Sequence, residues 1–546
     1  MKNKLNIGRR HFLVISASTA LATLYLGAKN VLARKSETQN SGSKEVVVAN
    51  ARLGINLAGI ADWSTEQPFV DFFHMSRDWV SQVKSGDWGT GPALELDEHG
   101  WVKRLAKNCY ATRIICSLEG KQFPSGNYVI LYDGEGTITF SNGTVITHKA
   151  SLENKSGRIE LRVDAAKGPL FLEIHKTNPQ NYLRNIRVIL PGFEPTYQSN
   201  PWHPDFLKRW SGIACLRFMD FMATNNSDQI KWSDRPKVTD ASYASKGVPL
   251  ELLVDLANRL NTDAWFCMPH QADDDYVKQF ALYVKQNLKP ELHAWVEYSN
   301  EVWNGTFNQN DYAGKAGQHL KFADKPWEAA WKFNAYRSVQ IFKIWTEVYG
   351  GPERIVRVLA SQAASAYVSD QILSFQDAAS NADVLAIAPY VALSVPPTAE
   401  DGVAEKEVAL WSLDKLFDHI HKVSLPESEK WIKDSKQIAD RHGLKLVAYE
   451  AGQHLVGIAG AENNEKLTKL FLQANADARM GEVYAQNLAT WERLGGDLLC
   501  SFHSMSSWSK WGSWGLLRNY GELPASSPKF MASVKWAISR GQKMTY

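Results

Sequence analysis

Short apolar runs alternate with longer amphipathic stretches along most of the chain. Runs typical of buried strands occur at Leu53–Ile60, Ala214–Met219, Asp263–Met268, Ala294–Tyr298, Ile355–Ala360, Val384–Ala388, Lys445–Tyr449 and Leu498–Phe502. Stretches with helical periodicity lie between them, for example at 249–260, 274–287 and 327–349. Eight such units predict an α/β protein, a (β/α)8 TIM barrel. A doubly wound open sheet is the alternative, but no G-x-G-x-x-G follows the first run.

The hydrophobic pattern changes between the first and second βα units, where apolar and polar residues alternate with a period of two. Such runs occur at Tyr128–Tyr132, Thr137–Phe140, Arg158–Val163, Leu170–Ile174 and Ile186–Leu190. Turn signals such as Asp133-Gly and Asn142-Gly separate them. This pattern predicts a small all-β, sandwich-like module at 109–190, inserted between the first and second βα units. The barrel would then comprise residues 53–108 and 191–546.

Two short motifs indicate helix starts. Ser64 to Gln67 is similar to a capping box, and it predicts a helix over Phe69–Phe73 after the first strand. The run Asp273-Asp-Asp275 could suggest a calcium loop, but it lacks the alternating ligand spacing of one. We expect these aspartates to cap the helix that begins near Tyr276.

The N-terminal residues have the character of a targeting signal. Arg9-Arg10 precedes an apolar stretch of small residues that runs to Ala28, and Val31-Leu-Ala33 is similar to an A-x-A cleavage site. This predicts a twin-arginine signal peptide at 1–33, a linker at 34–52 and a periplasmic or secreted mature protein. A membrane anchor is the alternative, but it needs about 20 continuous apolar residues, and serines, threonines and a lysine interrupt this stretch.

The net charge of the chain bears on which partners it is expected to bind. The full chain has a formal charge of +3, and residues 1–33 contain five basic and no acidic residues, so cleavage leaves −2. A protein that binds nucleic acid would show a basic stripe, so we expect no nucleic-acid partner. No later stretch is long and apolar enough to cross a bilayer, so we also expect no membrane contact after cleavage.

The five cysteines do not form a recognisable framework. They are odd in number and contain no C-x-x-C pair. Only Cys109 and Cys116 are placed so that they could pair, and the sequence leaves that open. Since no metal or dinucleotide motif occurs either, we expect neither a metal site nor a cofactor.

Two glutamates lie at the ends of strand-like runs. Glu301 follows the fourth run and Glu450 ends the seventh. A carboxylate just past an apolar run is costly to bury without a partner or a task. Because the strands of a barrel deliver their C-terminal ends to one face, the two carboxyl groups are expected to meet there. A pair of carboxyl groups can divide glycoside cleavage between a proton donor and a nucleophile.

These residues carry a family resemblance. The chain resembles the clan A retaining (β/α)8 glycoside hydrolases, whose acid/base follows strand four after an asparagine and whose nucleophile ends strand seven. The resemblance implies that Glu301 is the acid/base, Glu450 the nucleophile and Asn300 a contact of the substrate 2-hydroxyl. It also implies that Arg217 supports the nucleophile and that Tyr390 bonds it.

Further positions are implied by the same resemblance. His270 would contact the sugar. A tryptophan after strand eight would form the floor of the sugar site, and Trp508 is favoured for this role over Trp511 and Trp514. Independently of the resemblance, Trp303 lies in a loop expected to follow strand four, where its ring could form a sugar platform or an apolar plug over the barrel rim. The histidine often found two residues before the strand-six tyrosine is Ala388 here, which separates the chain from the best-known cellulase subfamilies.

The leading hypothesis is an exported retaining glycoside hydrolase acting on a β-linked polysaccharide or oligosaccharide. An alternative is a non-catalytic carbohydrate-binding protein, since the chain also resembles bacterial proteins labelled cellulose-binding. A cofactor-bearing redox enzyme is a third possibility, because twin-arginine leaders often export such proteins. Each glutamate could also have a structural role, Glu301 at a helix N-terminus and Glu450 in an ion pair.

Overall fold

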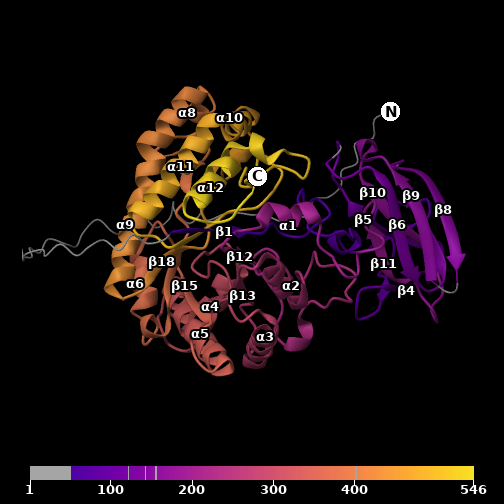
Figure 1. Ribbon diagram of the computed structural model, residues 1–546, viewed down its shortest axis with the longest axis horizontal. Helices are drawn as coiled ribbons and strands as arrows, with labels where there is room; N and C mark the ends of the chain where they lie inside the picture. The colour runs from indigo at the N-terminus through magenta and orange to yellow at the C-terminus, as the bar shows by residue number, and fades with distance from the viewer. Residues whose placement is uncertain (1–50, 121, 142, 154–155, 400–401, 546) are drawn as a thin grey trace, which may run out of the picture.

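A closed barrel of eight parallel strands forms the larger part of the computed structural model (Figure 1). The model describes residues 51–545 except 121, 142, 154–155 and 400–401, so the predicted signal peptide and nearly all of the linker lie outside it. The barrel strands, in order around the ring, are β1 (Arg52–Asn56), β12 (Cys215–Arg217), β13 (Asp263–Met268), β14 (Ala294–Tyr298), β15 (Ile355–Ala360), β16 (Val384–Ile387), β18 (Lys445–Ala448) and β20 (Leu498–Ser501). All eight predicted strands contribute, which confirms the TIM-barrel prediction.

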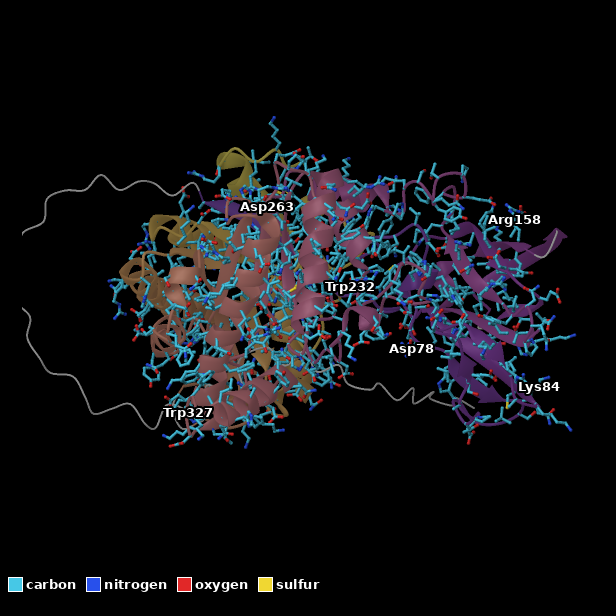
Figure 2. The ribbon with its side chains drawn as sticks, turned by 90° about the horizontal axis from the view of Figure 1, so that it is seen from below. Asp78, Lys84, Arg158, Trp232, Asp263 and Trp327 are labelled. Carbon is cyan, nitrogen blue, oxygen red and sulfur yellow. The ribbon has the colours of Figure 1, made fainter. Side chains whose placement is uncertain are left out.

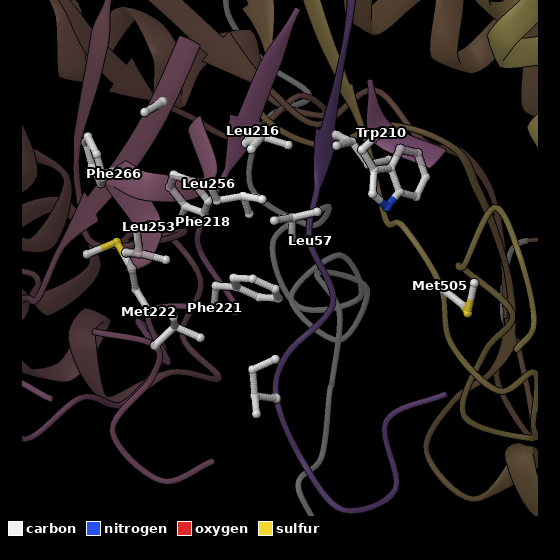
Figure 3. Close-up of a cluster of buried hydrophobic side chains, with 14 of the residues drawn as sticks. Leu57, Trp210, Leu216, Phe218, Phe221, Met222, Leu253, Leu256, Phe266 and Met505 are labelled. Atoms are coloured by element: carbon white, nitrogen blue, oxygen red, sulfur yellow. The ribbon is translucent and has the colours of Figure 1, made fainter. Parts of the chain in front are cut away.

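Alternation along the strands separates the barrel interior from the layer under the helices. On β12, Cys215 and Arg217 face the interior, whereas Leu216 and Phe218 pack outward. Figure 3 shows these outward side chains with Leu253 and Leu256 of the following helix. Burial of this layer removes a large apolar area from water and is the main source of barrel stability.

Helices cover the outside of the barrel. The α-helices are α1 (Pro204–Trp210), α2 (Leu250–Leu260), α3 (Asp274–Asn287), α4 (Asn308–His319), α5 (Pro326–Tyr349), α6 (Ala366–Leu373), α7 (Glu405–Val408), α8 (Leu413–His419), α9 (Leu425–Arg441), α10 (Glu465–Ala476), α11 (Ala478–Arg493) and α12 (Pro528–Ser539). The Asp273 carboxylate accepts a bond from the Tyr276 amide at 2.8 Å, so this aspartate caps α3. Within residues 51–545 as described, none of the helices has the length and apolar character of a membrane span.

An all-β module lies beside the barrel (Figure 1) and falls between β1 and β12 in the chain. Its two four-stranded sheets have the orders β2-β5-β10-β7 and β11-β6-β9-β8. The strands are β2 (Val80–Val83), β5 (Cys109–Cys116), β6 (Gly126–Asp133), β7 (Gly136–Ser141), β8 (Val145–Glu153), β9 (Ser156–Val163), β10 (Leu170–Thr177) and β11 (Arg184–Ile189), with a hairpin β3 (Glu95–Leu96) and β4 (Val102–Arg104). The first sheet begins at β2, which lies before the predicted boundary at Cys109.

The helix predicted over Phe69–Phe73 is wrong. Phe69 forms an isolated bridge with Trp202 and Asp71 forms one with Ile189, so this segment pairs with distant chain instead of coiling. The Asp71 carboxylate accepts bonds from the amides of Phe73 and Val188. Only a short 3-10 turn, η1 (Phe73–Met75), follows. Pairing with the chain that leaves the module therefore overrides the local capping signal.

In a second view the all-β module and the barrel lie side by side as two separate parts of the molecule. Figure 2 shows Lys84 and Arg158 on the module at one end, Asp263 and Trp327 on the barrel at the other, and Asp78 and Trp232 between them. The five cysteines, Cys109, Cys116, Cys215, Cys267 and Cys500, are all buried and free. A further two-stranded sheet, β17 (Val391–Val395) with β19 (Gln453–Gly457), follows β16 and β18 and extends them beyond the barrel rim.

Candidate active site

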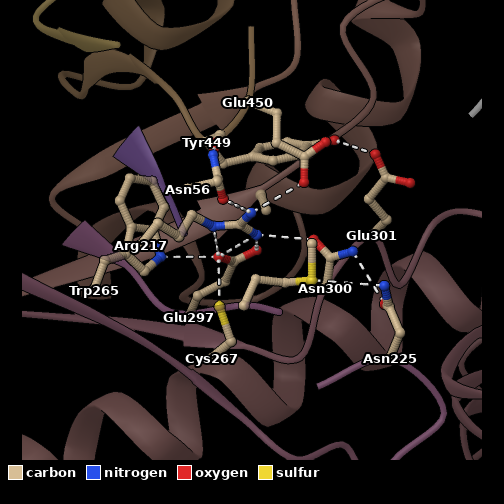
Figure 4. Close-up of polar contacts among 12 residues, drawn as sticks. Asn56, Arg217, Asn225, Trp265, Cys267, Glu297, Asn300, Glu301, Tyr449 and Glu450 are labelled. Carbon is tan, nitrogen blue, oxygen red and sulfur yellow. Dashed lines mark hydrogen bonds and ion pairs between the residues drawn. The ribbon is translucent and has the colours of Figure 1, made fainter. Parts of the chain in front are cut away.

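Arg217 is the centre of a polar network at the C-terminal end of the barrel interior (Figure 4). Its guanidinium donates to Glu297 at 2.9 Å, to Glu450 at 3.1 Å and to Asn300 at 2.8 Å. It also donates at 3.0 Å to Asn56, the last residue of β1. The arginine is completely buried, which disfavours its cation, but Glu297 and Glu450 hold its pKa above the ordinary range. Arg217, which ends β12, therefore bonds groups that lie on or just after three other barrel strands, β1, β14 and β18.

Glu297 is a member of this network that the sequence analysis did not single out. It lies inside β14 and faces the barrel interior, and its carboxylate also accepts bonds from the Trp265 indole at 2.9 Å and from the Cys267 thiol at 3.4 Å. The signal was present, because a glutamate four residues before Glu301 interrupts an apolar strand. Its bonds with Arg217 satisfy a buried charge that would otherwise be expensive.

Glu450 follows β18 and points into the same space. Its second carboxyl oxygen accepts a bond from the Tyr390 hydroxyl at 2.9 Å, in addition to the bond from Arg217. Burial raises the pKa of Glu450, whereas Arg217 and the Tyr390 hydroxyl act in the opposite direction. This carboxyl group alone in the pair has a cation as a direct partner, so it is the better candidate for the ionised form.

Glu301 lies in a different environment. Its carboxyl oxygens accept bonds from the Tyr449 hydroxyl at 3.0 Å and from the Asn304 amide at 2.9 Å. Burial, and then the charge of Glu450, raise the pKa of Glu301 to about 8. Figure 4 shows the Tyr449 hydroxyl between the two glutamates. Because one carboxyl group is paired with a cation and the other with neutral donors, the two favour different protonation states near neutral pH.

The backbone that presents Glu301 is strained. Ser299 and Glu301 have φ values of 57° and 44°, in the left-handed region that residues with side chains seldom adopt. Neighbouring loops hold this turn. The Gln309 amide donates to the Asn300 carbonyl at 2.8 Å, and the side chains of Asn300 and Gln309 both donate to Asn225. The loop after β12 therefore supports the turn that carries Glu301.

The remaining predicted residues lie at different distances from this network. His270 is buried, its ring contacts Tyr312 at 5.3 Å, and its Nδ1 has no hydrogen-bond partner among the described residues. Burial lowers the pKa of His270. Trp303 is buried two residues beyond Glu301, and its indole nitrogen also lacks a partner in the described part of the chain.

Trp508 is half-buried, and its ring contacts two cations. The Lys529 ammonium lies 4.2 Å and the Arg518 guanidinium 5.0 Å from the ring centroid. The Trp508 indole donates to the Gly515 carbonyl at 3.3 Å. These contacts tie the ring to its own loop and to α12, and none of them involves Glu301 or Glu450.

A different aromatic residue follows the last barrel strand directly. Phe502 comes after β20, and its ring lies 6.4 Å from that of Tyr390 and 6.3 Å from that of Trp514. Trp514 donates to His454 at 3.2 Å, and the His454 ring lies 5.7 Å from Tyr390. This aromatic group supports the tyrosine that bonds Glu450. The sequence did not indicate a role for Phe502, because this residue ends the apolar run Leu498–Phe502 that predicts the last strand.

No family model and no curated protein sequence matches the chain. Similar solved structures include a GH51 arabinofuranosidase from Xanthomonas axonopodis pv. citri, with 12% identity, a TM-score of 0.39, and coverage of 62% of this chain and 66% of that chain. An endo-1,4-beta-D-mannanase from Thermotoga petrophila RKU-1 has 13% identity and a TM-score of 0.32 over 61% of this chain and 94% of its own.

A Bacteroidetes-affiliated GH5 cellulase is also similar, with 10% identity and a TM-score of 0.29 over 53% of this chain and 73% of its own. The structural neighbours are thus glycoside hydrolases. The aligned region spans just under two thirds of the arabinofuranosidase's length. No comparison bears on the resemblance to proteins labelled cellulose-binding, and the roles argued below rest on the contacts of the side chains.

Among the described residues, no group of three or more His, Cys, Asp or Glu side chains is arranged to hold a metal ion. What the residues provide, at the C-terminal end of the barrel, is a carboxyl group whose pKa burial raises to about 8 and a second carboxyl group that is paired with a cation. That combination can donate a proton to one side of a bond while a carboxylate attacks from the other.

Proposed function

We propose that this protein is a retaining glycoside hydrolase that acts on a β-linked polysaccharide or oligosaccharide by double displacement. The observation that carries the proposal is the contrast between the two glutamates: Glu450 bonds Arg217, whereas Glu301 bonds only neutral donors. The substrate class follows from the resemblance to the clan A enzymes. Carboxyl groups with divergent protonation preferences are what this chemistry needs.

In the first step, the Glu450 carboxylate attacks the anomeric carbon, and the bond from that carbon to the leaving oxygen breaks. Glu301 gives its proton to the leaving oxygen, so the departing sugar leaves as an alcohol. Arg217 and Tyr390 bond the carboxyl oxygens of Glu450 and hold them in place for attack. The product of this step is an ester between Glu450 and the sugar.

In the second step, Glu301 is a carboxylate and takes a proton from water. The water oxygen attacks the anomeric carbon, the ester bond breaks, and Glu450 is released as a carboxylate. Two displacements at one carbon return the original configuration. The Tyr449 hydroxyl and the Asn304 amide stabilise the anionic form of Glu301 in this step, since both donate to it.

The proposal also includes export, through the predicted twin-arginine signal peptide at 1–33. This segment lies outside the described residues, so its support is the pattern around Arg9 and Arg10. Fractionation of cells that express the full chain, with N-terminal sequencing of the mature protein, tests this part. We expect cleavage near Ala33 and loss of export after Arg9→Lys/Arg10→Lys.

A polysaccharide panel with product analysis tests the activity. Proton NMR during hydrolysis should show the β-anomer first, because retention precedes mutarotation. Glu301→Ala should regain rate with azide on a substrate with a good leaving group, giving a β-glycosyl azide, because azide needs no general base. Initial release of the α-anomer would contradict double displacement. Glycan binding without release of reducing ends would favour the non-catalytic binding protein.

A further inference from the structure

A further carboxyl group, that of Asp220, has no assigned role, and the charged groups that act on it are Glu450 and Arg217. Asp220 follows Arg217 by three residues, on the loop after β12. The backbone there turns sharply, since the Ala223 amide donates to the Asp220 carbonyl at 3.0 Å. On the other side is the segment after β1: a Cβ built on Gly59 would lie 3.6 Å from the Asp220 Cβ. Asp220 therefore occupies the rim between the ends of β1 and β12.

The neighbours of Asp220 are fixed, whereas its own carboxyl group is free. Phe218, Phe221 and Met222 are buried in the layer that Figure 3 draws. Asp220 itself is only partly buried. Among the described residues, the carboxyl of Asp220 makes no hydrogen bond, and the charged groups that act on it are Glu450 and Arg217. The loop thus holds the backbone rigidly and leaves one acceptor open at the site.

The other carboxyl groups of the site are all satisfied by the protein. Glu297 accepts bonds from Arg217, Trp265 and Cys267, and the two candidate catalytic glutamates each accept two. Burial and then the charge of Glu450 raise the pKa of Asp220 to about 7, although Arg217 acts in the opposite direction. Polar groups kept in an unfavourable electrostatic setting without a structural partner are concentrated at functional sites.

Charge limits what this open acceptor can bind. Arg217 is a cation that acts on Asp220, Glu301 and Glu450, and it already bonds Glu297 and Glu450. With Glu301 protonated, the carboxylates of Glu297 and Glu450 outnumber the one cation they share, Arg217, and Asp220 adds a third negative charge as the pH rises through about 7. A ligand carboxylate would meet like charges and a cation that already has two carboxylate partners, whereas sugar hydroxyls would find an acceptor.

We propose that Asp220 binds hydroxyl groups of the sugar that Glu450 attacks, and that the carboxyl groups around Arg217 restrict this position to sugars without a carboxylate. The inference rests on the proposed function, because it takes the space in front of Glu450 as the sugar site. It adds a specificity-determining residue and a substrate class, uncharged glycosides as opposed to uronic acids.

Affinity electrophoresis tests this without turnover. The background is Glu301→Gln, which replaces a protonated carboxyl with a neutral isostere and so keeps the charge of the site. Native gels contain a neutral glycan (hydroxyethyl cellulose, xylan or galactomannan) or carboxymethyl cellulose as the acidic counterpart. We expect retardation by at least one neutral glycan and none by carboxymethyl cellulose.

Added substitutions then isolate Asp220. Asp220→Ala should weaken binding of the neutral glycan about 10- to 100-fold, as loss of hydrogen bonds to a charged acceptor implies. Asp220→Asn should lower the neutral-to-acidic discrimination at least about tenfold, because it removes one negative charge. Asp228→Asn is the matched control, since Asp228 is exposed on the same loop and acts on His270 instead. Circular dichroism and thermal unfolding verify that each variant folds.

Several outcomes would overturn the inference. These are unchanged neutral-glycan binding by Asp220→Ala, equal binding of neutral and carboxymethyl glycans before substitution, an equal effect of Asp228→Asn, or retardation by none of the glycans. Failure of the proposed function gives a different result. In that case the neutral glycan binds and Asp220→Ala weakens it, but the unsubstituted protein releases no reducing ends.

Discussion

The two ends of the barrel interior are built from the same eight strands but differ in chemistry. Toward the N-terminal end, the inward side chains include Cys215, Trp295, Val384 and Leu498, which are buried and apolar. At the C-terminal end the inward positions hold the charged network around Arg217, with Glu297 and Glu450. The apolar end is what a packed core requires. The charged end stabilises the fold poorly, since removing ions from water costs several kcal/mol each.

The difference between the two ends implies that the apolar end contributes mainly to stability and the charged end mainly to activity. An apolar layer contributes through area and packing, so any change of shape there lowers stability. A buried network of charges is retained where its geometry does chemistry, and replacing it with apolar groups is often neutral for stability. Substitutions at the charged end should therefore change activity or its pH dependence, whereas a substitution at the apolar end should lower stability and leave the pH dependence unchanged.

The largest effect is expected at the charged end. Glu450→Ala removes the proposed nucleophile, so hydrolysis of the polysaccharide found in the panel should fall by about 10⁴-fold or more. The apparent Tm should stay the same or rise, because the variant no longer buries this carboxyl group. Initial rates and differential scanning calorimetry measure the two effects. Activity within tenfold of the unsubstituted protein would remove Glu450 from the mechanism.

Arg217→Met should destabilise the protein by about 3–5 kcal/mol, because it leaves Glu297 buried without its cation. Adding Glu297→Gln should recover much of that loss, since the unpaired charge is gone, while hydrolysis stays abolished. Urea unfolding of both variants measures this. Equal stability of the single and double variants would show that the Arg217–Glu297 pair is not the coupled unit described here.

At the apolar end, Leu498→Ala should cost about 2–4 kcal/mol of stability through lost burial and a cavity. The pH dependence of kcat/KM should be unchanged, because Leu498 begins β20, at the opposite end of that strand from Phe502, whose ring lies near Tyr390. Thermal unfolding and pH–rate profiles give the two readouts. A shifted pH profile would mean that the two ends are mechanically coupled, contrary to the comparison.

The sequence predicted the apolar part of the barrel better than its charged part. Apolar runs of about five residues mark every barrel strand, and their ends singled out the two glutamates, whereas Arg217 and Tyr390 came from the family resemblance. Glu297 and Tyr449 were missed because they lie within apolar runs, where facing direction rather than residue type decides the role. Sequence alone does not give the registers that turn both toward Arg217.

Elements that depend on distant pairing were also difficult to predict. The strands β2 and β5 belong to the module sheet, but β5 contains the buried Arg113, which disturbs its apolar pattern. Its guanidinium bonds Ser76 and lies over the Phe73 ring, contacts that only the fold supplies. The same applies to the chain at Phe69–Phe73, where pairing with distant residues overrides a local helix signal.

The smallest effect concerns the proton on Glu301. Activity that needs protonated Glu301 should decline as pH rises through about 8, the pKa that burial and Glu450 produce. The Tyr449 hydroxyl donates to Glu301 and thereby lowers this pKa. Tyr449→Phe removes that donor, so the alkaline limb of kcat/KM should move to higher pH, by about 1 unit or less.

Tyr276→Phe is the matched control for this shift, because its hydroxyl bonds Gln229 on the far side of the loop after β12. It should leave the alkaline limb in place. A limb that moves to lower pH in Tyr449→Phe would mean that the tyrosine stabilises the protonated form. If the alkaline limb does not move in Tyr449→Phe, the limb reports the titration of another group. Glu301 would then not be the acid that the charged end of the barrel provides.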